Sequence, residues 1–310
     1  MTGDHMRCGF IGLGHIGKFL AGSLVRNGFE VTVFDLNADA AAPLVAKGAK
    51  LAGSIKELCD ASDTVFTCLP SPRAIDAVVA GAGGVIESLA GRSTRGTWID
   101  MSTNNQDETL RLGAMCEAKG INVLESPVTG GVHKAAHGDI TVLVGGEEAV
   151  FKAHEKALNA MGQPVLYIGK LGSAAVIKVI TNMLAFIHLV AVGEALMLAK
   201  RGGLDLGVAF EAIKQSSGNS FVHETESQVI LNGSYNINFT MDLALKDMGF
   251  ALGYGKEFGV PLALATLTNE QFVLAKAAYG GEAWSSQVVK LLEDATGSDL
   301  RAPGFPAELE

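Results

Sequence analysis

A lysine and an asparagine stand as isolated polar residues in a strongly apolar segment of the second half of the chain. Lys178 and Asn182 are four residues apart, so a helix over this segment would place them on one face. Burial disfavours the charged form of a lysine, which suits it to proton transfer. Spacing alone leaves two interpretations open. The pair transfers a proton, or the lysine reaches solvent while the asparagine bonds a neighbouring helix.

A glycine-rich loop near the N-terminus is a candidate phosphate-binding element. The expected strand Cys8–Ile11 runs directly into a GxGxxG motif that comprises Gly12, Gly14, His15, Ile16 and Gly17. The glycines permit a tight turn and let the backbone approach a pyrophosphate, which then faces the amide donors of a helix N-terminus. The motif alone is weak, but a strand before it and a helix after it make the match much stronger.

Asp35 occupies the position expected of a ribose-binding carboxylate. It ends a second expected strand, eighteen residues beyond Gly17. A carboxylate accepts hydrogen bonds from both ribose hydroxyls and repels a 2′-phosphate, and no arginine follows it in the stretch 36–38. The sequence therefore predicts NAD as the cofactor rather than NADP. The alternative is a plain tight turn in which Asp35 only caps a loop.

A second glycine pair follows a later expected strand. The segment from Glu125 continues through Ser126 to Thr129, Gly130 and Gly131. A hydroxyl beside two glycines at the end of a strand can form a cup of backbone amides for a carboxylate. On this motif alone an ordinary turn is the favoured interpretation.

Composition and charge narrow the classes of function. The chain has 310 residues, of which 48% are hydrophobic, and a formal net charge of -9. An acidic surface repels phosphate backbones and anionic lipid headgroups, so we expect neither nucleic acid nor a membrane as partner. The four cysteines form no CxxC pair and no zinc-like spacing with histidine, so we expect no metal and a reducing, cytoplasmic location.

Neither of the segments that could direct the chain to a membrane has the required pattern. The stretch Met1–Arg7 lacks the apolar core of an export signal. The longest apolar stretch, Val179–Gly193, is shorter than the roughly 20 residues that a bilayer demands, and it contains Asn182 and His188. We expect a buried helix of a soluble protein there.

The chain has two halves with different periodicity. Up to about residue 168, β-rich runs alternate with helical segments, which predicts crossover connections and a parallel sheet covered on both faces. After Gly172 the period is helical, so we expect an α/β domain over 1–170, an all-helical domain over 171–310 and an extended or loose tail from Arg301. The expected strands are Cys8–Ile11, Val31–Phe34, Thr64–Leu69, Thr97–Asp100, Val123–Glu125, Thr141–Val144 and Val165–Ile168, and the expected helices include Leu20–Arg26, Ile55–Ala61 and Leu110–Lys119.

Four stretches together resemble the β-hydroxyacid dehydrogenase family, which includes 3-hydroxyisobutyrate dehydrogenase and tartronate semialdehyde reductase. They are Gly9–Gly17, Ser126–Gly131, the helix with Lys178 and Asn182, and Lys246-Asp247, in the family's order. The resemblance covers nearly the whole chain. It implies a Rossmann-like domain joined by a long helix to an all-helical domain, and NAD-dependent oxidation of a small β-hydroxy acid or reduction of the matching semialdehyde. It also implies a homodimer or homotetramer assembled through the helical domain.

The same resemblance implies roles for individual residues. Lys178 is the implied catalytic acid/base, and Asn182 helps to hold the substrate. Lys246 approaches the cofactor. The substrate carboxylate is implied to bind at Ser126, Thr129, Gly130 and Gly131, and the nicotinamide pocket to be lined by Leu69, Pro70, Ser102 and Thr103.

Three positions depart from the usual family pattern and leave the substrate open. Glu125-Ser126 stands where Asp-Ala is usual, Lys134 beside His133 stands where a small residue is usual, and Ala174 stands in place of a glycine. The candidates are 3-hydroxyisobutyrate, serine, glycerate and related semialdehydes. A Lys134 near the pocket would pair with a second anionic group on the substrate, and the plainer alternative is a solvated loop lysine.

Two other functions compete with the dehydrogenase. An imine reductase or reductive aminase of the same fold would generally lack the lysine at position 178. A non-catalytic nucleotide-binding module would have no need of the Lys178–Asn182 pair. His133, His137 and His188 are alternative bases that no motif supports.

Overall fold

The structure of the protein is a computed structural model that describes residues 6–92 and 94–309. It divides into two compact units, Met1–Lys178 and Val179–Glu310. The division falls inside helix α9 (Ser173–Arg201), whereas the predicted domain limit at residue 170 lies just before that helix. The stretch Met1–Arg7 was expected to carry no export signal. Its residues 1–5 lie outside the described residues.

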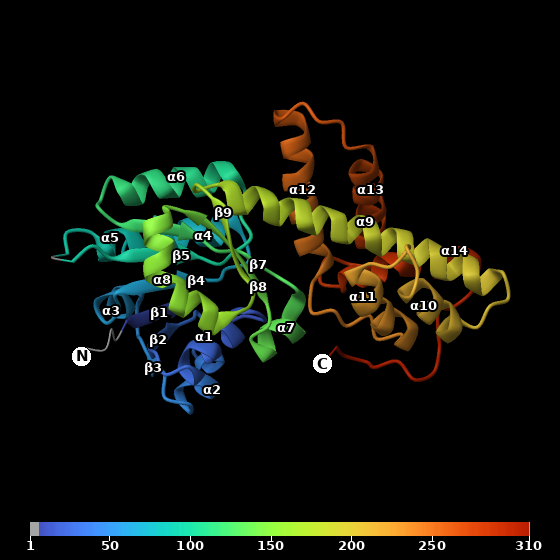
Figure 1. Cartoon of the computed structure of the whole chain (residues 1–310), viewed down its shortest axis with the longest axis horizontal. Helices are drawn as coiled ribbons and strands as arrows, with labels where there is room; N and C mark the ends of the chain where they lie inside the picture. Colours follow the sequence, from blue (N-terminus) through green and yellow to red (C-terminus); the bar gives the residue numbers. More distant parts are fainter. Residues whose placement is uncertain (1–5, 93, 310) are drawn as a thin grey trace. The chain divides into compact units, whose positions relative to one another are not determined.

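A nine-stranded sheet forms the centre of the first unit in the part of the chain that the structure describes (Figure 1). The strand order is β3-β2-β1-β4-β5-β6-β8-β7, with β9 paired to β8. The strands are β1 (Arg7–Ile11), β2 (Glu30–Phe34), β3 (Lys50–Leu51), β4 (Thr64–Thr67), β5 (Thr97–Asp100), β6 (Asn122–Glu125), β7 (Val128–Thr129), β8 (Thr141–Gly146) and β9 (Val165–Gly169).

All seven expected strands are present, but the sheet is not parallel throughout. Pairing is parallel from β3 to β6 and between β8 and β9, whereas β8 runs antiparallel to both β6 and β7. The expectation of an all-parallel sheet was therefore wrong at this edge. The prediction missed this edge because β7 has only two residues, too few to show a periodicity in the sequence. It is joined to β8 through the short helix α7 (Gly131–His137).

Apolar residues cover both faces of the central strands, which is why these strands are continuous apolar runs rather than alternating ones. Phe10, Phe66 and Ile99 point into one buried cluster, which the helices α1 and α8 complete. Their neighbours Ile11, Val65 and Trp98 point into a second cluster with α3 to α6. The helices of the first unit are α1 (Gly17–Arg26), η1 (Ala38–Ala41), α2 (Ala42–Val45), α3 (Ile55–Asp60), α4 (Pro72–Val79), α5 (Val85–Leu89), α6 (Gln106–Glu117), α7 (Gly131–His137) and α8 (Glu148–Met161).

Side-chain caps set the starts of several helices. The Asn105 side chain accepts a hydrogen bond from the Glu108 amide, so α6 begins at Gln106, four residues before the expected start. Ser54 caps α3 in the same way. The helical period of apolar residues predicted these helices, but polar capping residues fall outside that period.

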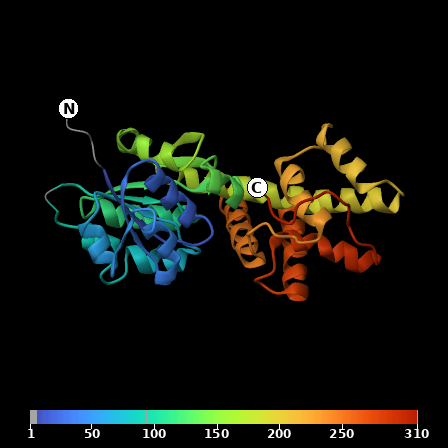
Figure 2. The ribbon, with the colours of Figure 1, turned by 90° about the horizontal axis from the view of Figure 1, so that it is seen from below.

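The second unit is helical, as expected. It contains most of α9 together with α10 (Leu206–Lys214), α11 (Phe221–Asn232), α12 (Met241–Glu257), α13 (Ala263–Tyr279), η2 (Ser285–Val289) and α14 (Lys290–Thr296). The helices α12 and α13 pack side by side, and α9 is one continuous helix (Figure 2).

Helix α9 is long and apolar enough to cross a membrane by length and composition alone. The core helix of a soluble protein passes the same test. Here Phe186, Leu189 and Leu196 are buried in the core of the second unit, with at most 6% of each residue exposed. One part of the surface of α9 therefore packs into the core of the second unit.

The C-terminal segment is extended, as expected, but it is packed rather than loose. The Ala302 amide donates to the Leu231 carbonyl, and the Asn232 side chain donates to the Phe305 carbonyl. Its anchor is the buried Glu293 carboxylate, which accepts hydrogen bonds from the Leu300 amide at 2.7 Å and from Arg301 at 2.7 Å.

Breaking this anchor tests whether the tail contributes to stability. We expect Arg301→Met to lower the free energy of unfolding by about 1.5–3 kcal/mol, because a buried carboxylate loses a charged hydrogen-bond donor. Lys290→Met is the matched control, since Lys290 pairs with the more exposed Asp294 and its loss should cost no more than about 1 kcal/mol. Urea unfolding measures both, and equal losses would contradict the anchoring role.

Candidate active site

The glycine-rich loop after β1 has a backbone that only glycine permits. Gly12 has φ of +94°, and a Cβ there would lie 2.3 Å from the Cys68 carbonyl oxygen. A Cβ on Gly17 would lie 2.0 Å from the Gly12 carbonyl oxygen. Gly14 is exposed, and an added Cβ would meet no atom within 4 Å. The loop is thus closed beneath and open above, which is the arrangement that lets a pyrophosphate approach its amides. His15 is exposed and Ile16 half-buried at the start of α1.

Asp35 is held beside this loop by two backbone amides. Its Oδ2 accepts from the Leu13 amide at 2.7 Å, and its Oδ1 accepts from the Asn37 amide at 2.8 Å. A carboxylate has roughly four lone-pair positions, so each oxygen keeps capacity for a ribose hydroxyl. The residues present therefore fit a dinucleotide.

The ends of β4 and β5 lie next to the glycine loop. The Leu69 amide donates to the Ser102 Oγ at 2.9 Å, and Leu69 Cδ2 lies 3.0 Å from the position of a Cβ on Gly12. The structure thus brings Leu69, with its exposed neighbour Pro70, close to Ser102 and the half-buried Thr103. These are the residues that the sequence analysis assigned to the nicotinamide side.

The predicted carboxylate loop carries basic side chains over its glycines. Gly130 and Gly131 have φ of +128° and +89°. A Cβ on Gly130 would meet Lys134 Cδ at 3.1 Å, and a Cβ on Gly131 would meet His133 Cε1 at 3.0 Å. Burial lowers the pKa of His133, and the nearby Lys134 and His137 lower it further. An imidazole ring and a lysine stem therefore lie over this turn.

The two hydroxyl residues predicted in this loop differ in accessibility. Thr129 is half-buried on β7. Ser126 is 0% exposed, and its Oγ has no hydrogen-bond partner among the residues that the structure describes. The Ser126 amide donates to the Asp100 carbonyl at 2.5 Å. The contact of both residues with substrate stays a prediction.

Lys178 lies in the second turn of α9 and is 7% exposed, so it does not reach freely into solvent. Asn182 follows it one turn later. The Asn182 amide nitrogen donates to Asp247 Oδ2 at 2.7 Å, so this side chain does bond a neighbouring helix, α12. Lys246 Nζ lies 2.9 Å from Asp247 Oδ1, and Asp247 itself is 1% exposed.

Two acidic residues of this region were not predicted as functional. Asp247 accepts a hydrogen bond from Asn182 and lies beside Lys246, and its signal in the sequence was its place directly after Lys246. Glu125, at the end of β6, is 3% exposed and accepts hydrogen bonds from the Ala174 and Ala175 amides at 2.9 Å each. Its signal was the departure from the family's usual Asp at this position.

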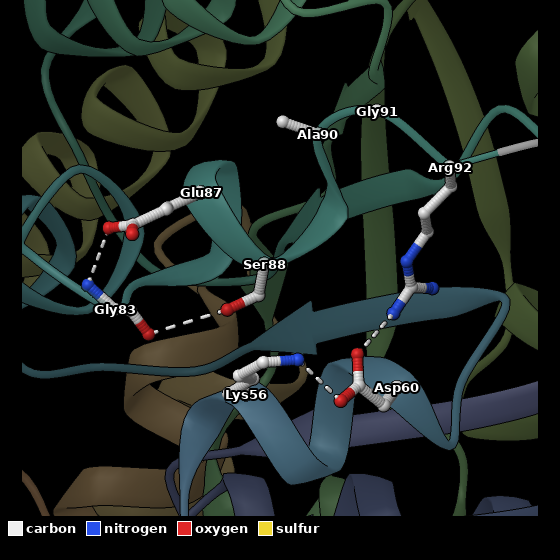
Figure 3. Close-up of a pocket in the computed structure, with 8 residues that line it drawn as sticks. All are labelled: Lys56, Asp60, Gly83, Glu87, Ser88, Ala90, Gly91 and Arg92. Atoms are coloured by element: carbon white, nitrogen blue, oxygen red, sulfur yellow. Dashed lines mark hydrogen bonds and ion pairs between the residues drawn. The ribbon is translucent and has the colours of Figure 1, made fainter.

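A separate cavity of about 310 Å³ lies away from these residues (Figure 3). Its charged groups already satisfy one another, since Lys56 lies 2.7 Å from Asp60 and Glu87 accepts from the Gly83 amide. Arg92 donates to backbone carbonyls. The cavity is lined by Lys56, Asp60, Gly83, Glu87, Ser88, Ala90, Gly91 and Arg92. It contains none of the predicted site residues.

Two family models match consecutive parts of the chain. A family model described as the NAD binding domain of 6-phosphogluconate dehydrogenase matches residues 7–169. A second, described as NAD-binding of NADP-dependent 3-hydroxyisobutyrate dehydrogenase, matches residues 172–292. The chain is 35% identical over 293 residues to 2-(hydroxymethyl)glutarate dehydrogenase of Eubacterium barkeri, covering 94% of this chain and 96% of that protein. The chain belongs to the β-hydroxyacid dehydrogenase family.

Solved structures of the family have the same fold. A 3-hydroxyisobutyrate dehydrogenase from Salmonella typhimurium is 30% identical, with a TM-score of 0.84, covering 92% of this chain and 99% of that one. An imine reductase from Myxococcus stipitatus, at 17% identity and a TM-score of 0.62, covers 93% of this chain and 99% of that one and shares the fold alone. Membership confirms the predicted fold class, the NAD-type cofactor and the assignment as a dehydrogenase.

The carboxylate at position 35 generates a prediction about the cofactor. We expect a preference for NAD over NADP in kcat/KM, and expect Asp35→Ala to reduce kcat/KM for NAD by about 10–100-fold, because hydrogen bonds to a charged group are lost. Its effect on NADP should be smaller, since a repulsive charge is removed as well. Steady-state kinetics with both cofactors measures this.

A control separates charge from loop geometry, because Asp35 also anchors two backbone amides. Asp35→Asn keeps an oxygen acceptor, so its kcat/KM for NAD should fall less than that of Asp35→Ala. Its kcat/KM for NADP should exceed that of the parent. An unmodified enzyme that uses both cofactors equally well would contradict the role assigned to Asp35.

Proposed function

We propose that the protein oxidises a small β-hydroxy acid with NAD, or reduces the matching semialdehyde, with Lys178 as general acid/base. The observation that carries this proposal is a buried lysine one helical turn from an asparagine that a buried aspartate holds in place. The proposal includes NAD rather than NADP, a cytoplasmic location and domain limits of 1–170 and 171–310.

The proposed chemistry assigns each side chain one task. When bound, NAD supplies the acceptor for the hydride that leaves the carbinol carbon. Neutral Lys178 takes the hydroxyl proton during oxidation, and in reduction its ammonium returns that proton and stabilises the developing alkoxide. Asn182 orients the substrate, and its own orientation comes from the hydrogen bond to Asp247.

The substrate carboxylate is proposed to bind at the loop after β6. Gly130 and Gly131, in backbone conformations that favour glycine, present amides beside the Thr129 hydroxyl. Ser126 of the same loop is proposed to contribute its hydroxyl, which is buried and has no hydrogen-bond partner among the described residues.

A second anionic group on the substrate is proposed to pair with Lys134. Two observations support this: the Lys134 stem packs over Gly130, and the relative from Eubacterium barkeri is named for 2-(hydroxymethyl)glutarate, which has two carboxylates. The proposed substrate class is therefore a β-hydroxy acid that carries an additional anionic group.

A homodimer or homotetramer is proposed to form through the helical domain. One side of α13 is apolar and exposed, with Leu264, Leu267 and Leu274 at 67%, 61% and 55% exposure. Large exposed apolar surfaces of this kind are typical of subunit interfaces.

Replacement of the lysine tests the proposed function directly. We expect Lys178→Ala to lower kcat by at least about 10²–10⁴-fold, the usual contribution of positioned general acid–base catalysis, with little change in NAD binding. Lys178→Arg should not restore oxidation, because a guanidinium stays protonated and cannot act as base. Asn182→Ala should lower kcat less and raise KM. A folded Lys178→Ala enzyme with near-parental kcat would refute the assignment and direct attention to His133 or His137.

Replacement of Lys134 tests the proposed substrate class. We expect Lys134→Gln to raise KM about tenfold or more for a dianionic hydroxy acid, because one charge-assisted hydrogen bond is lost, and to leave a monoanionic one unchanged. Lys119→Gln, at an exposed position in the same unit, is the control. An equal change in KM for both substrates would show that Lys134 does not bind the second anionic group.

A further inference from the structure

Glu125 clasps the first turn of the helix that carries Lys178. Its Oε1 accepts from the Ala174 amide and its Oε2 from the Ala175 amide, both at 2.9 Å. These amides belong to the second and third residues of α9, which have no acceptor within their own helix. Because the clasp is buried, water cannot replace the carboxylate as acceptor.

The room for this carboxylate depends on the absence of a side chain on the neighbouring strand. Glu125 of β6 pairs directly with Gly145 of β8 in the antiparallel register. A Cβ on Gly145 would lie 2.3 Å from Glu125 Oε1 and 3.0 Å from its Cδ. Any larger residue at position 145 therefore displaces the clasp without altering the carboxyl group itself.

The surroundings of Glu125 hold its two protonation states close in free energy. Burial raises the pKa of Glu125 to about 7, and the nearby Asp100 contributes to the rise, against backbone hydrogen bonds from Gly172, Ala174 and Ala175 that lower it. Asp100 on β5 is the charged group that faces Glu125 from the packed strands, and α9 faces it with its amide donors. The carboxyl group thus gains or loses its proton in the neutral pH range.

We propose that Glu125 is a positioning residue, whose ionised carboxylate fixes the first turn of α9 and so places Lys178 for proton transfer. This inference rests on the role proposed for Lys178. The link is short, because the Ala174 carbonyl is the helical hydrogen-bond acceptor of the Lys178 amide, four residues on.

Protonation of Glu125 breaks the clasp for a geometric reason. A carboxylate offers two acceptor oxygens to the two amides, whereas a carboxylic acid has one oxygen that carries a proton and becomes a donor. One amide then faces a hydroxyl oxygen, which is a much weaker acceptor than a carboxylate oxygen. The ordered form is present above pH 7 and is lost as the pH falls through about 7.

Three variants test the clasp in the full-length enzyme. Glu125→Gln keeps the size but puts an NH₂ against one amide, so it imitates the protonated form at every pH. Glu125→Asp keeps the charge and shortens the side chain by one methylene. Gly145→Ala keeps Glu125 and removes its space. Glu57→Gln is the matched control, since Glu57 also accepts from a backbone amide near a helix start but is exposed.

Activity gives the first readout. In Glu125→Gln and Gly145→Ala we expect kcat for oxidation to fall about ten- to hundredfold, because small misplacement of a catalytic group has effects of this size, while KM for NAD stays within about twofold. Glu125→Asp should recover part of the loss. On the acidic side of a plot of log kcat against pH, the slope should exceed that of a single ionisation in the parent and in Glu57→Gln. In Glu125→Gln the slope should fall to that of a single ionisation.

Amide hydrogen exchange gives a second readout that does not depend on activity. Protection of the Ala174 and Ala175 amides in the unmodified enzyme should decrease as the pH falls from 8 to 6, after correction for the intrinsic exchange rate. In Glu125→Gln this protection should be low throughout.

The outcomes separate the two proposals. If Lys178→Ala abolishes turnover but Glu125→Gln leaves kcat, pH profile and amide protection unchanged, the clasp is refuted and the role of Lys178 stands. If protection follows the pH as expected while Lys178→Ala retains activity, the role of Lys178 fails and the positioning inference fails with it. The experiment on the unmodified enzyme needs no variant to fold.

Discussion

Parallel pairing in strict register is the constraint on which the first unit depends. Ile11 of β1 lies opposite Phe34 of β2 and Thr67 of β4, and the row continues through Asp100 of β5 to Glu125 of β6. Five strands therefore end in one line. The residue or loop that follows each of them emerges at the same edge, so segments scattered over more than a hundred positions of the chain meet there. The glycine loop, Asp35, the predicted nicotinamide pocket and the predicted carboxylate loop are each a continuation of one of these strands.

Much of this could be predicted, because the strands that matter are apolar on both faces and bounded by glycine and polar residues. Gly12 and Gly17 could be placed as well, since a Cβ at either position would collide with a backbone carbonyl oxygen. The antiparallel edge could not be predicted, because β7 has two residues and its pairing with β8 is set by the link through α7 rather than by any periodicity.

The buried acids show a different limit of sequence reasoning. Glu125 is paired with amides 49 and 50 residues away, and Asp247 with an asparagine 65 residues away. A carboxylate in a sequence is usually solvated, so nothing local distinguishes one that is enclosed. Lys178 could be singled out because its own neighbours are apolar. Glu125 could not, because the atoms that hold it are backbone amides, which every residue except proline has.

At the short helix α7, backbone conformation and side chains have different tasks. The turn at Gly130 and Gly131 is defined by backbone conformation, and the side chains of Lys134 and His133 lie over it. Neither residue belongs to a strand, to the glycine loop or to α9. Under the role proposed for Lys134, substrate preference depends on α7, whereas proton transfer depends on a residue of another element. Related dehydrogenases with this fold can therefore differ in substrate while their chemistry stays the same.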